Sequence, residues 1–593
     1  MNSARKTRRR LAVSVLAVLA IVGLFVGRLV DIQVVNAEEL NEQSLGKRSI
    51  TSTEYAARGS IVDSNGNLLA DSVERYDITA SPRLLAEIFE KYGYYKRSVE
   101  GSKEKVEVTF AQTVTEISDT LGLDPAEVTR ILTENPKSDH VYVAKSRTLA
   151  DLLAVQKLRI PYLNSSLRPS RTYPAGAVAG NLTGFMGTDG PQAGLELSEN
   201  TCLANVNGTS TYERSEDGVR LPGSTVVTKA AKDGGTLKLT IDRDFQFYVQ
   251  EVMNAKGAEL GADWATAVIV RVNDGHIMAM ADYPSVDPND VNGTDVTSLG
   301  SKAFANPYEP GSTIKPITAA SLLDAGKINQ TTNVVVPSVL TTEGGGRIKD
   351  SFGHGELHYT TGGVITNSSN IGISLLSDKL DKDARRDYLL KFGFDQKTAV
   401  GFGGESAGDI PDTKKWDAIT KYAISFGQGM STTSAQVASA YQTLGNGGVR
   451  MPLTLVESCT RADGTVTQVP TGEGVRAVSE KAADQTVQMM ENVVTQGWLS
   501  NTLQIPGYRI AAKTGTAQVA EGGRYGDNYT ISVAGLIPAE APEYAVVVTF
   551  GNPDTMKTSG AAAPTFTKIM TQVIKSFRVT PSTKPAPQIP QTW

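Results

Sequence analysis

The residues best suited to chemistry in this sequence are a serine and a lysine three positions apart, Ser312 and Lys315, in the segment PGSTIK at 310–315. Pro316 is tolerated only in the first turn of a helix, so it sets the start of a predicted helix near Ser312 and puts both side chains on one face. A hydroxyl beside a neutral amine is an activated nucleophile. Burial and a second cation must lower the pKa of Lys315 by about three units. The spacing alone is common by chance.

A second polar element, Ser368-Ser369-Asn370, precedes an apolar run. The hydroxyl of Ser368 could relay a proton, and the amide of Asn370 could hold a substrate amide. Taken alone, the element is more typical of a helix cap.

A third element, Lys513-Thr514-Gly515-Thr516, lies inside a predicted strand over 508–519. A strand with lysine and glycine in its middle is typical of a sheet edge, and an edge can accept an extended peptide as an added strand. Lys513 and the two threonine hydroxyls would meet a carboxylate of that peptide, and Gly515 would let its backbone approach. Lys513 would also supply the second cation that Lys315 needs. The plain alternative is a surface lysine on an ordinary strand.

The three elements together are far more specific than any one of them. They follow one another at separations of 56 and 145 residues, which is the S-x-x-K, S-x-N and K-T-G set of penicillin-recognising serine enzymes. Over nearly its whole length the sequence resembles the class B penicillin-binding proteins, the monofunctional D,D-transpeptidases of the cell wall. Further matching segments are RGSIVD at 58–63, RTYP at 171–174, GLE at 194–196, TID at 240–242, YEP at 308–310 and GQG at 427–429. The central residue of the second motif is serine rather than aspartate, and only its outer positions are required.

The resemblance implies a two-step acyl transfer without a metal or cofactor. Ser312 attacks the penultimate D-Ala carbonyl of a stem peptide, terminal D-Ala leaves, and an amine of a second stem resolves the acyl-enzyme. It implies catalytic roles for Ser312, Lys315 (base), Ser368 (proton relay), Asn370 and Lys513, and substrate binding by Thr514, Gly515 and Thr516. By analogy the backbone N–H groups of Ser312 and Thr516 form the oxyanion hole. β-Lactams would trap Ser312 as a slow acyl adduct.

Five predicted strands and a closing helix must position these motifs. Apolar runs over 265–272 and 276–281 are joined by Asn273-Asp274-Gly275, a strong hairpin signal. Strand candidates follow at 508–519, 529–537 and 544–550, and a helix begins at Pro564. We therefore expect an α+β fold, in which one antiparallel sheet closed by the two ends of the domain is flanked by helices and carries an inserted helical block.

The N-terminal half differs in texture, with short strand-like runs and a helical portion near 110–133. It suits an extended, β-rich pedestal of the dimerisation type. The expected parts of the chain are a cytoplasmic tail at 1–10, a transmembrane anchor at 11–30, the pedestal at 31–235, the transpeptidase domain at 236–578, and a disordered, proline-rich tail at 579–593.

The N-terminus predicts a single membrane anchor. Five cations lie within residues 5–10, and the 17 residues from Leu11 to Gly27 carry no charge. The positive cluster stays in the cytoplasm, which places the catalytic domain outside the cell. A cleaved signal peptide is the rival reading, with a weak cleavage site at 35–37. Outside the membrane, Cys202 and Cys459 could pair, but the sequence does not decide whether they meet.

Composition excludes several classes of protein. The net charge of −5 gives no basic excess for nucleic acid, and two cysteines rule out a disulfide scaffold or a cysteine-bound metal core. A G-x-S-x-G match at 404–408 has no preceding strand. The segment HGELH at 354–358 has its letters in the wrong order for a zinc protease.

The resemblance further implies partners and a cellular role. The substrate would be stem peptides on lipid-linked or nascent glycan, made by a membrane glycan polymerase that acts with other division proteins. Overall similarity to cell-division transpeptidases of Gram-positive actinobacteria favours septal synthesis. The alternatives are an elongation-type transpeptidase, a β-lactam sensor or hydrolase on the same fold, and a catalytically silent division scaffold.

Overall fold

The computed structural model describes residues 2–40, 49–98, 104–213, 221–521 and 524–593. They form two compact units. The first comprises 1–57, 76–169 and 205–233, and the second 58–75, 170–204 and 234–593. The second unit thus takes in two segments from the region that the sequence assigns to the pedestal. The predicted domain limits themselves stay a prediction.

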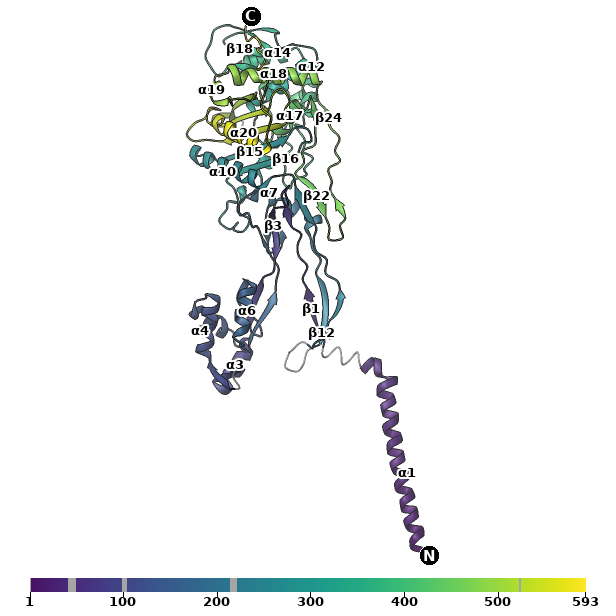
Figure 1. Ribbon diagram of the computed structural model, residues 1–593. Coiled ribbons are helices and arrows are strands. Elements are labelled where there is room, and N and C mark those ends of the chain that lie inside the picture. The colour runs from purple at the N-terminus through teal and green to yellow at the C-terminus, as the bar shows by residue number, and fades with distance from the viewer. Residues whose placement is uncertain (1, 41–48, 99–103, 214–220, 522–523) are drawn as a thin grey trace. The chain divides into compact units, whose positions relative to one another are not determined.

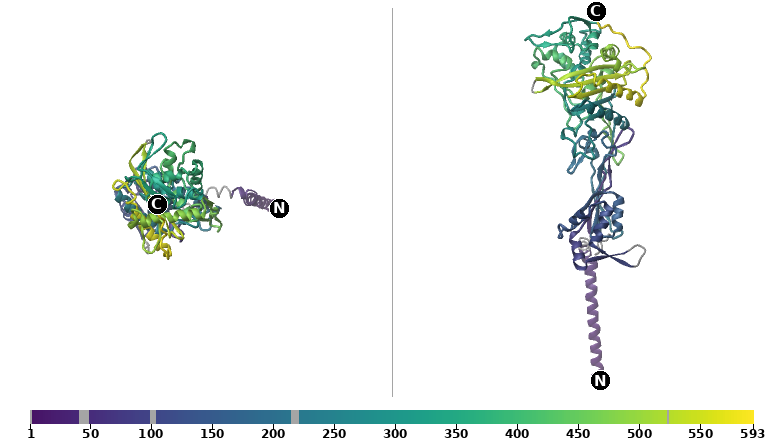
Figure 2. Two further views of the ribbon diagram at one scale, coloured as in Figure 1. Left: turned by 90° about the horizontal axis from the view of Figure 1, so that it is seen from above. Right: turned by 90° about the vertical axis from the view of Figure 1, so that its left-hand side faces the viewer.

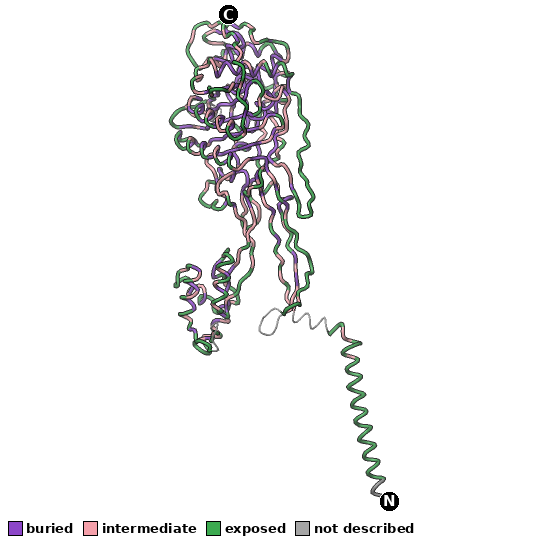
Figure 3. Tube along the Cα trace, in the orientation of Figure 1, coloured by how far each residue is buried: buried purple, intermediate pink, exposed green. Residues whose placement is uncertain are grey.

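The first unit begins with helix α1 (Asn2–Val30), which a short π-helical turn extends to Val35. The most apolar 18-residue window of the span Arg5–Val35 has a mean hydropathy of 2.5, and none of that window is buried (Figure 3). Among the residues that the structure describes, it is the one helix long and apolar enough to cross a membrane.

The rest of the first unit contains two three-stranded sheets and a two-stranded one, β5 (Tyr94–Ser98) with β6 (Lys105–Thr109). Strand β4 (Tyr76–Ala80) lies between β7 (Val141–Arg147) and β8 (Leu163–Leu167), and β12 (Gly208–Glu213) lies between β1 (Ser49–Glu54) and β13 (Val226–Lys229). Helices α3 (Pro82–Tyr92), α4 (Phe110–Leu121), α5 (Pro125–Thr133) and α6 (Leu149–Lys157) complete it. The helical portion predicted near 110–133 is therefore two helices, because Gly122 ends α4 in a left-handed conformation.

The second unit is built on one five-stranded antiparallel sheet, as predicted. Its strand order is β16 (Ile277–Tyr283), β15 (Trp264–Arg271), β27 (Tyr544–Gly551), β26 (Arg524–Ile537) and β25 (Ala511–Glu521). The predicted hairpin joins β15 to β16, and the three late strands complete the sheet. Strand β25, which carries the third motif, lies at the edge.

Helices cover both faces of this sheet (Figure 1). Helices α10 (Arg243–Leu260) and α20 (Ala563–Phe577) pack on one face, and α17 (Ser434–Gly445) and α18 (Glu480–Gln496) pack on the other. The apolar stripe of the predicted closing helix is buried in α20, with Phe566, Ile569, Met570 and Val573 fully enclosed. Each such side chain contributes about 1.5–3 kcal/mol through burial.

A second sheet in this unit is built around residues 236–239. Strand β14 (Thr236–Leu239) pairs in parallel with β2 (Ile61–Val62) and antiparallel with β22 (Val456–Thr460). Next to this sheet, Cys202 and Cys459 form a disulfide across 257 positions of sequence. The structure thus answers the pairing question that the sequence left open.

Residues 579–593 differ from the predicted disordered tail, because they pack along the surface of the second unit (the yellow end of the chain in Figure 2). Ile589 is buried, and the backbone N–H of Ser582 donates to the carbonyl of Gly507. The four prolines keep this segment out of helix and sheet, but hydrogen bonds with the domain replace regular structure.

Candidate active site

The first motif lies in a tight turn that leads into a buried helix. A 3-10 turn covers Gly311–Ile314 (η3), and helix α12 (Lys315–Asp324) begins directly after it. The α-helix therefore begins three residues later than Ser312, while Pro316 lies in the first helical turn as predicted. Gly311 has φ of +56°, and its N–H donates to the carbonyl of Gly427 at 3.0 Å. A Cβ atom at Gly427 would overlap the backbone of Gly311, so only glycine fits there.

Lys315 is completely buried, and three groups of the second motif surround its amine. Its Nζ donates to the backbone oxygen of Ser368 at 2.5 Å and to Oδ1 of Asn370 at 2.7 Å, and lies 3.2 Å from Oγ of Ser368. Burial and the charge of Lys513 hold the pKa of this amine well below its usual range. The two causes that the sequence analysis names for a lowered pKa of Lys315, burial and a second cation, are therefore both present.

The second motif joins helix α13 (Thr361–Thr366) to helix α14 (Asn370–Ser377). Ser368 has φ of +57°, a left-handed conformation that is uncommon for serine and turns its side chain and carbonyl toward the lysines. Ser369 caps α14, since its hydroxyl accepts from the N–H of Gly372 at 2.8 Å. Both interpretations of this motif therefore apply. Ser369, its middle residue, is a helix cap, and the outer residues Ser368 and Asn370 belong to the polar cluster around Lys315.

The third motif brings a second buried amine to the same hydroxyl. Lys513 on β25 donates from Nζ to Oγ of Ser368 at 2.9 Å and to the carbonyl of Thr514 at 3.1 Å. Burial lowers the pKa of its amine to about 7. The hydroxyl of Ser368 thus lies between the amines of Lys315 and Lys513.

The remaining residues of the third motif alternate along the edge strand. Lys513 and Gly515 share one face, whereas Thr514 and Thr516 share the other. A side chain at Gly515 would meet the methyl group of Thr313, so the glycine lets the turn of the first motif approach the strand. Thr516 is exposed, and its Oγ1 accepts from the N–H of Ser559 at 3.2 Å.

Ser312 itself is half-buried in this turn. Within the parts of the chain that the structure describes, its hydroxyl is not hydrogen-bonded to Lys315 or Ser368. Hydrogen bonds of a nucleophile are often formed only with substrate present. The neighbouring backbone is held, because the hydroxyl of buried Tyr441 donates to the carbonyl of Thr313 at 2.9 Å.

No sequence pattern pointed to Asp350, a residue outside the second motif that holds it in place. Its buried carboxylate accepts from Oγ of Ser369 at 2.7 Å and from the N–H of Ile371 at 2.9 Å, and it lies 3.1 Å from Nε2 of His354. Its charge raises the pKa of Lys315, against the effects of burial and Lys513. His354, from the segment HGELH that resembles a zinc-protease motif, therefore contacts this aspartate.

Glu309, directly before the first motif, joins two other segments to it. Its Oε1 accepts from the N–H of Gly429 at 2.9 Å and from the hydroxyl of Tyr525 at 3.1 Å. Burial raises the pKa of this carboxyl. The match of this residue to a family segment was visible in the sequence, but its contacts with Gly429 and Tyr525 were not.

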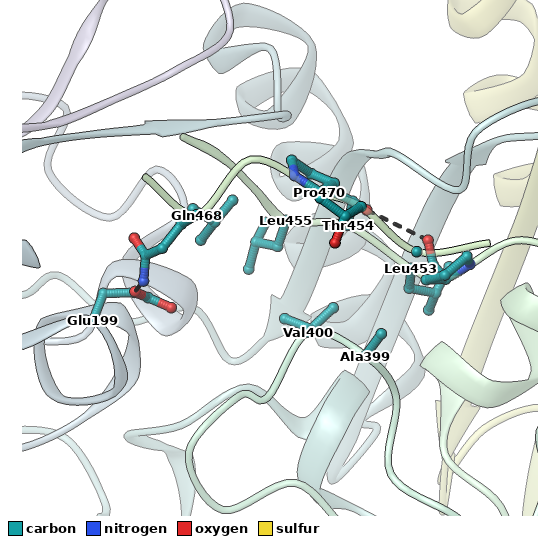
Figure 4. Close-up of a pocket in the computed structure, with 12 residues that line it drawn as sticks. Glu199, Ala399, Val400, Leu453, Thr454, Leu455, Gln468 and Pro470 are labelled. Atoms are coloured by element: carbon teal, nitrogen blue, oxygen red, sulfur yellow. Dashed lines mark hydrogen bonds between the residues drawn. The ribbon is translucent and has the colours of Figure 1, made fainter. Parts of the chain in front are cut away.

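A cavity of about 290 Å³ in the second unit contains none of the motif residues (Figure 4). It is lined by Ala399, Val400, Leu453, Leu455, Gln468 and Pro470, and Gln468 donates to the carboxylate of Glu199 at its rim. Its mostly apolar lining includes none of the serines and lysines of the three motifs. In the described part of the chain, no three histidine, cysteine or acidic side chains cluster as metal ligands would.

Two family matches cover both halves of the chain. Residues 265–571 match the penicillin binding protein transpeptidase domain, and residues 53–239 match the penicillin-binding protein dimerisation domain.

Named relatives match over nearly the full length. Penicillin-binding protein PbpB of Mycolicibacterium smegmatis is 33% identical, over 97% of this chain and 91% of its own. Peptidoglycan D,D-transpeptidase FtsI of Escherichia coli is 31% identical, over 95% of this chain and 91% of its own.

Solved structures agree with the fold. A peptidoglycan synthetase from Bifidobacterium adolescentis has a TM-score of 0.71 at 29% identity, covering 92% of this chain and 100% of that one. Penicillin binding protein 3 of Mycobacterium tuberculosis, in complex with ampicillin, has a TM-score of 0.70 at 28% identity, covering 91% of this chain and 100% of that one.

Proposed function

The chain belongs to the class B penicillin-binding proteins, and from this we propose that it is a serine-type peptidoglycan D,D-transpeptidase of septal wall synthesis. It cross-links stem peptides through an acyl-enzyme on Ser312 and binds penicillin covalently at the same residue. The observation that carries the proposal is the hydroxyl of Ser368 between two buried amines, 3.2 Å from Lys315 and 2.9 Å from Lys513.

In the first step Ser312 becomes an ester. Neutral Lys315 takes the proton of the Ser312 hydroxyl while Oγ bonds to the penultimate D-Ala carbonyl carbon. The peptide C–N bond then breaks, and the proton passes through Ser368 to the amine of the departing D-Ala. Backbone N–H groups of Ser312 and Thr516 stabilise the oxyanion, each by about 3–4 kcal/mol.

The surroundings of Lys315 support a neutral amine, because burial and the charge of Lys513 lower its pKa. A neutral amine has two N–H donors and one lone pair, and the two shortest contacts of Nζ are to oxygens that only accept, the Ser368 carbonyl and Asn370 Oδ1. The lone pair is then left to accept from a hydroxyl. Lys513 occupies the Ser368 oxygen from the other side, which leaves the Ser368 proton for transfer.

The open edge of β25 suits the donor peptide. The peptide adds as a strand beside Lys513–Thr516, and its terminal carboxylate meets the hydroxyls of Thr514 and Thr516 and the charge of Lys513. In the second step an amine of a neighbouring stem attacks the ester carbon, the C–Oγ bond breaks, and Ser312 recovers its proton.

Helix α1 anchors the protein in the membrane. The cations at 5–10 place the N-terminus in the cytoplasm and the catalytic unit outside, where its substrate lies on lipid-linked or nascent glycan. A membrane glycan polymerase and other division proteins are the partners that this reaction requires.

Labelling with a fluorescent penicillin tests the proposal. The full-length protein in detergent should form one long-lived adduct, which peptide mass spectrometry assigns to Ser312, and Ser312→Ala should abolish labelling without changing the thermal midpoint. With a D-Ala-D-Ala pentapeptide and an acceptor amine, the wild type should release D-Ala and form the new amide. If no adduct forms, the protein is the catalytically silent scaffold. If the adduct is hydrolysed rapidly, it is the β-lactam hydrolase.

A further inference from the structure

The segment Gln588–Trp593 lies against the helix that leads into the second motif. The N–H of Thr360 donates to the carbonyl of Gln591 at 2.9 Å, and Thr592 forms a β-bridge with Tyr359. The amide of Asn492 on α18 donates to the carbonyl of Ile589 at 2.8 Å. The segment is therefore bonded to two different elements beside the motif.

Two glycines of helix α13 form the surface against which this segment packs. A Cβ atom at Gly363 would overlap the carbonyl oxygen of Gln591, and one at Gly362 would lie 2.7 Å from a methyl group of Ile589. Neither glycine has a positive φ, so the helix backbone itself does not require them. The close approach of the segment gives the physical reason for glycine at both positions.

The side chain of Gln591 reaches the residue directly before Ser368. Its Oε1 accepts from Nδ2 of Asn367 at 2.8 Å, and its Nε2 donates to Oε1 of Gln496 at 2.7 Å. Asn367 also ends α13, since its Nδ2 donates to the carbonyl of Gly363 at 3.0 Å. A chain of direct contacts thus runs from Gln591 through Asn367 to Ser368.

Ser368 needs such support because its backbone is in a left-handed conformation and its carbonyl must meet Lys315 at 2.5 Å. A serine stays in this conformation only when its surroundings hold it there. We propose that Gln591 is a positioning residue of the transpeptidase, which holds Asn367 and thereby fixes Ser368 between Lys315 and Lys513. This inference rests on the proposed function and adds a residue that lies outside all three motifs.

Matched glutamines in the same segment allow a direct test. Gln591→Ala removes the contact with Asn367, whereas Gln588→Ala removes only a contact with Gln496. In the full-length protein, Gln591→Ala should lower the acylation rate constant for a fluorescent penicillin about 5–10-fold, as expected for one lost hydrogen bond that acts on the transition state. The dissociation constant of the initial complex should not change. Gln588→Ala should acylate like the wild type.

Two further variants separate positioning from general packing. Gln591→Glu keeps an oxygen that accepts from Asn367 and should restore at least half of the wild-type rate. Gly363→Ala should slow acylation in the full chain, but in a chain lacking residues 589–593 it should cause no further loss relative to that truncated chain, because the three atoms nearest to the added methyl group all belong to Gln591. Thermal midpoints identify any loss that comes from unfolding.

The outcomes are distinct. Wild-type acylation by Gln591→Ala, or an equal loss in Gln588→Ala, would overturn the positioning role while leaving the proposed function intact. A wild-type protein that never labels at Ser312 would overturn the proposed function, and this inference with it.

Discussion

Lys315 and Ser368, 53 positions apart in the sequence, are joined by the shortest polar contact of the site, 2.5 Å from Nζ to the backbone oxygen. This contact fixes the amine through a main-chain group, so its position does not depend on the rotamer of Ser368. The same serine presents its hydroxyl to Lys513. One residue in an uncommon backbone conformation therefore sets the spacing of both lysines.

Replacement of the buried base should abolish acylation without unfolding the protein. Lys315→Met removes the proposed base, so the acylation rate should fall by about 10²–10⁴-fold. The thermal midpoint should stay equal or rise, because a buried amine is replaced by an apolar chain. Stopped-flow penicillin labelling and a melting curve check both. A drop of less than tenfold would contradict the role of this lysine as the base.

The acylation rate should pass through a maximum with pH. Lys315 must be neutral to act as the base, and burial and the charge of Lys513 lower its pKa well below the usual range, so the rate should fall as pH drops through that lowered pKa. Lys513 must be charged to attract a carboxylate. Its pKa of about 7 means that the rate declines as pH rises through that value. A profile measured between pH 5 and pH 9 tests this, and a flat profile would show that neither amine limits the rate.

Burial of Lys513 should cost stability, with a defined pH dependence. Its pKa is about 7 when folded and near 10.5 when unfolded, so the unfolded chain binds more protons between these values. Wild-type stability should therefore rise with pH across that window.

Lys513→Met does not titrate, so this variant should melt above the wild type at pH 7, and the advantage should shrink by pH 10. Melting curves at both pH values provide the measurement, with Lys568→Met at an exposed lysine of α20 as the matched control. If the difference in melting temperature between Lys513→Met and the wild type grew with pH, it would contradict a lowered pKa of Lys513 in the folded protein.

The aspartate behind the second motif should affect both stability and pH dependence. Asp350→Asn removes a charge that raises the pKa of Lys315, so the acidic limb of the pH profile should move to lower pH. It also weakens the bonds to Ser369 and to the N–H of Ile371, at about 1–3 kcal/mol in unfolding free energy. A limb that moves to higher pH would exclude this electrostatic effect.

Loss of the disulfide should destabilise the second unit but leave the chemistry in place. The pair Cys202→Ser and Cys459→Ser opens a covalent loop across 257 positions, and loops of that length typically contribute about 2–5 kcal/mol. Denaturant unfolding measures the loss, and penicillin labelling at low temperature should be unchanged. Equal stability with and without the bond would be the contrary result.

Local patterns in the sequence predicted the catalytic sheet well. Alternating apolar runs and the turn at Asn273–Gly275 fall within a few residues of strands β15 and β16, because hairpins are determined by neighbouring residues. The edge position of β25 followed from Lys513 and Gly515 within a strand. The three motifs were found because their residue types and order are specific.

Contacts between distant segments could not be predicted in the same way. Asp350 acts through a loop with no periodic pattern, and the pairing of Cys202 with Cys459 depends on tertiary structure. Residues 579–593 have the composition of a disordered chain, but glycines in α13, more than 200 positions earlier, provide a surface that fits them. Composition indicates whether a segment would be ordered in isolation. It carries no information on a complementary surface elsewhere in the fold.

The open edge of β25 also has a consequence for the protein at high concentration. A row of unsatisfied backbone groups pairs with any extended strand, including the edge of another molecule, and such pairing leads to aggregation. Gly515 disfavours that pairing, because glycine has no side chain to pack against a partner strand, whereas buried Lys513 presents no charge to it. The glycine that makes this strand receptive to a short peptide thus also weakens self-association.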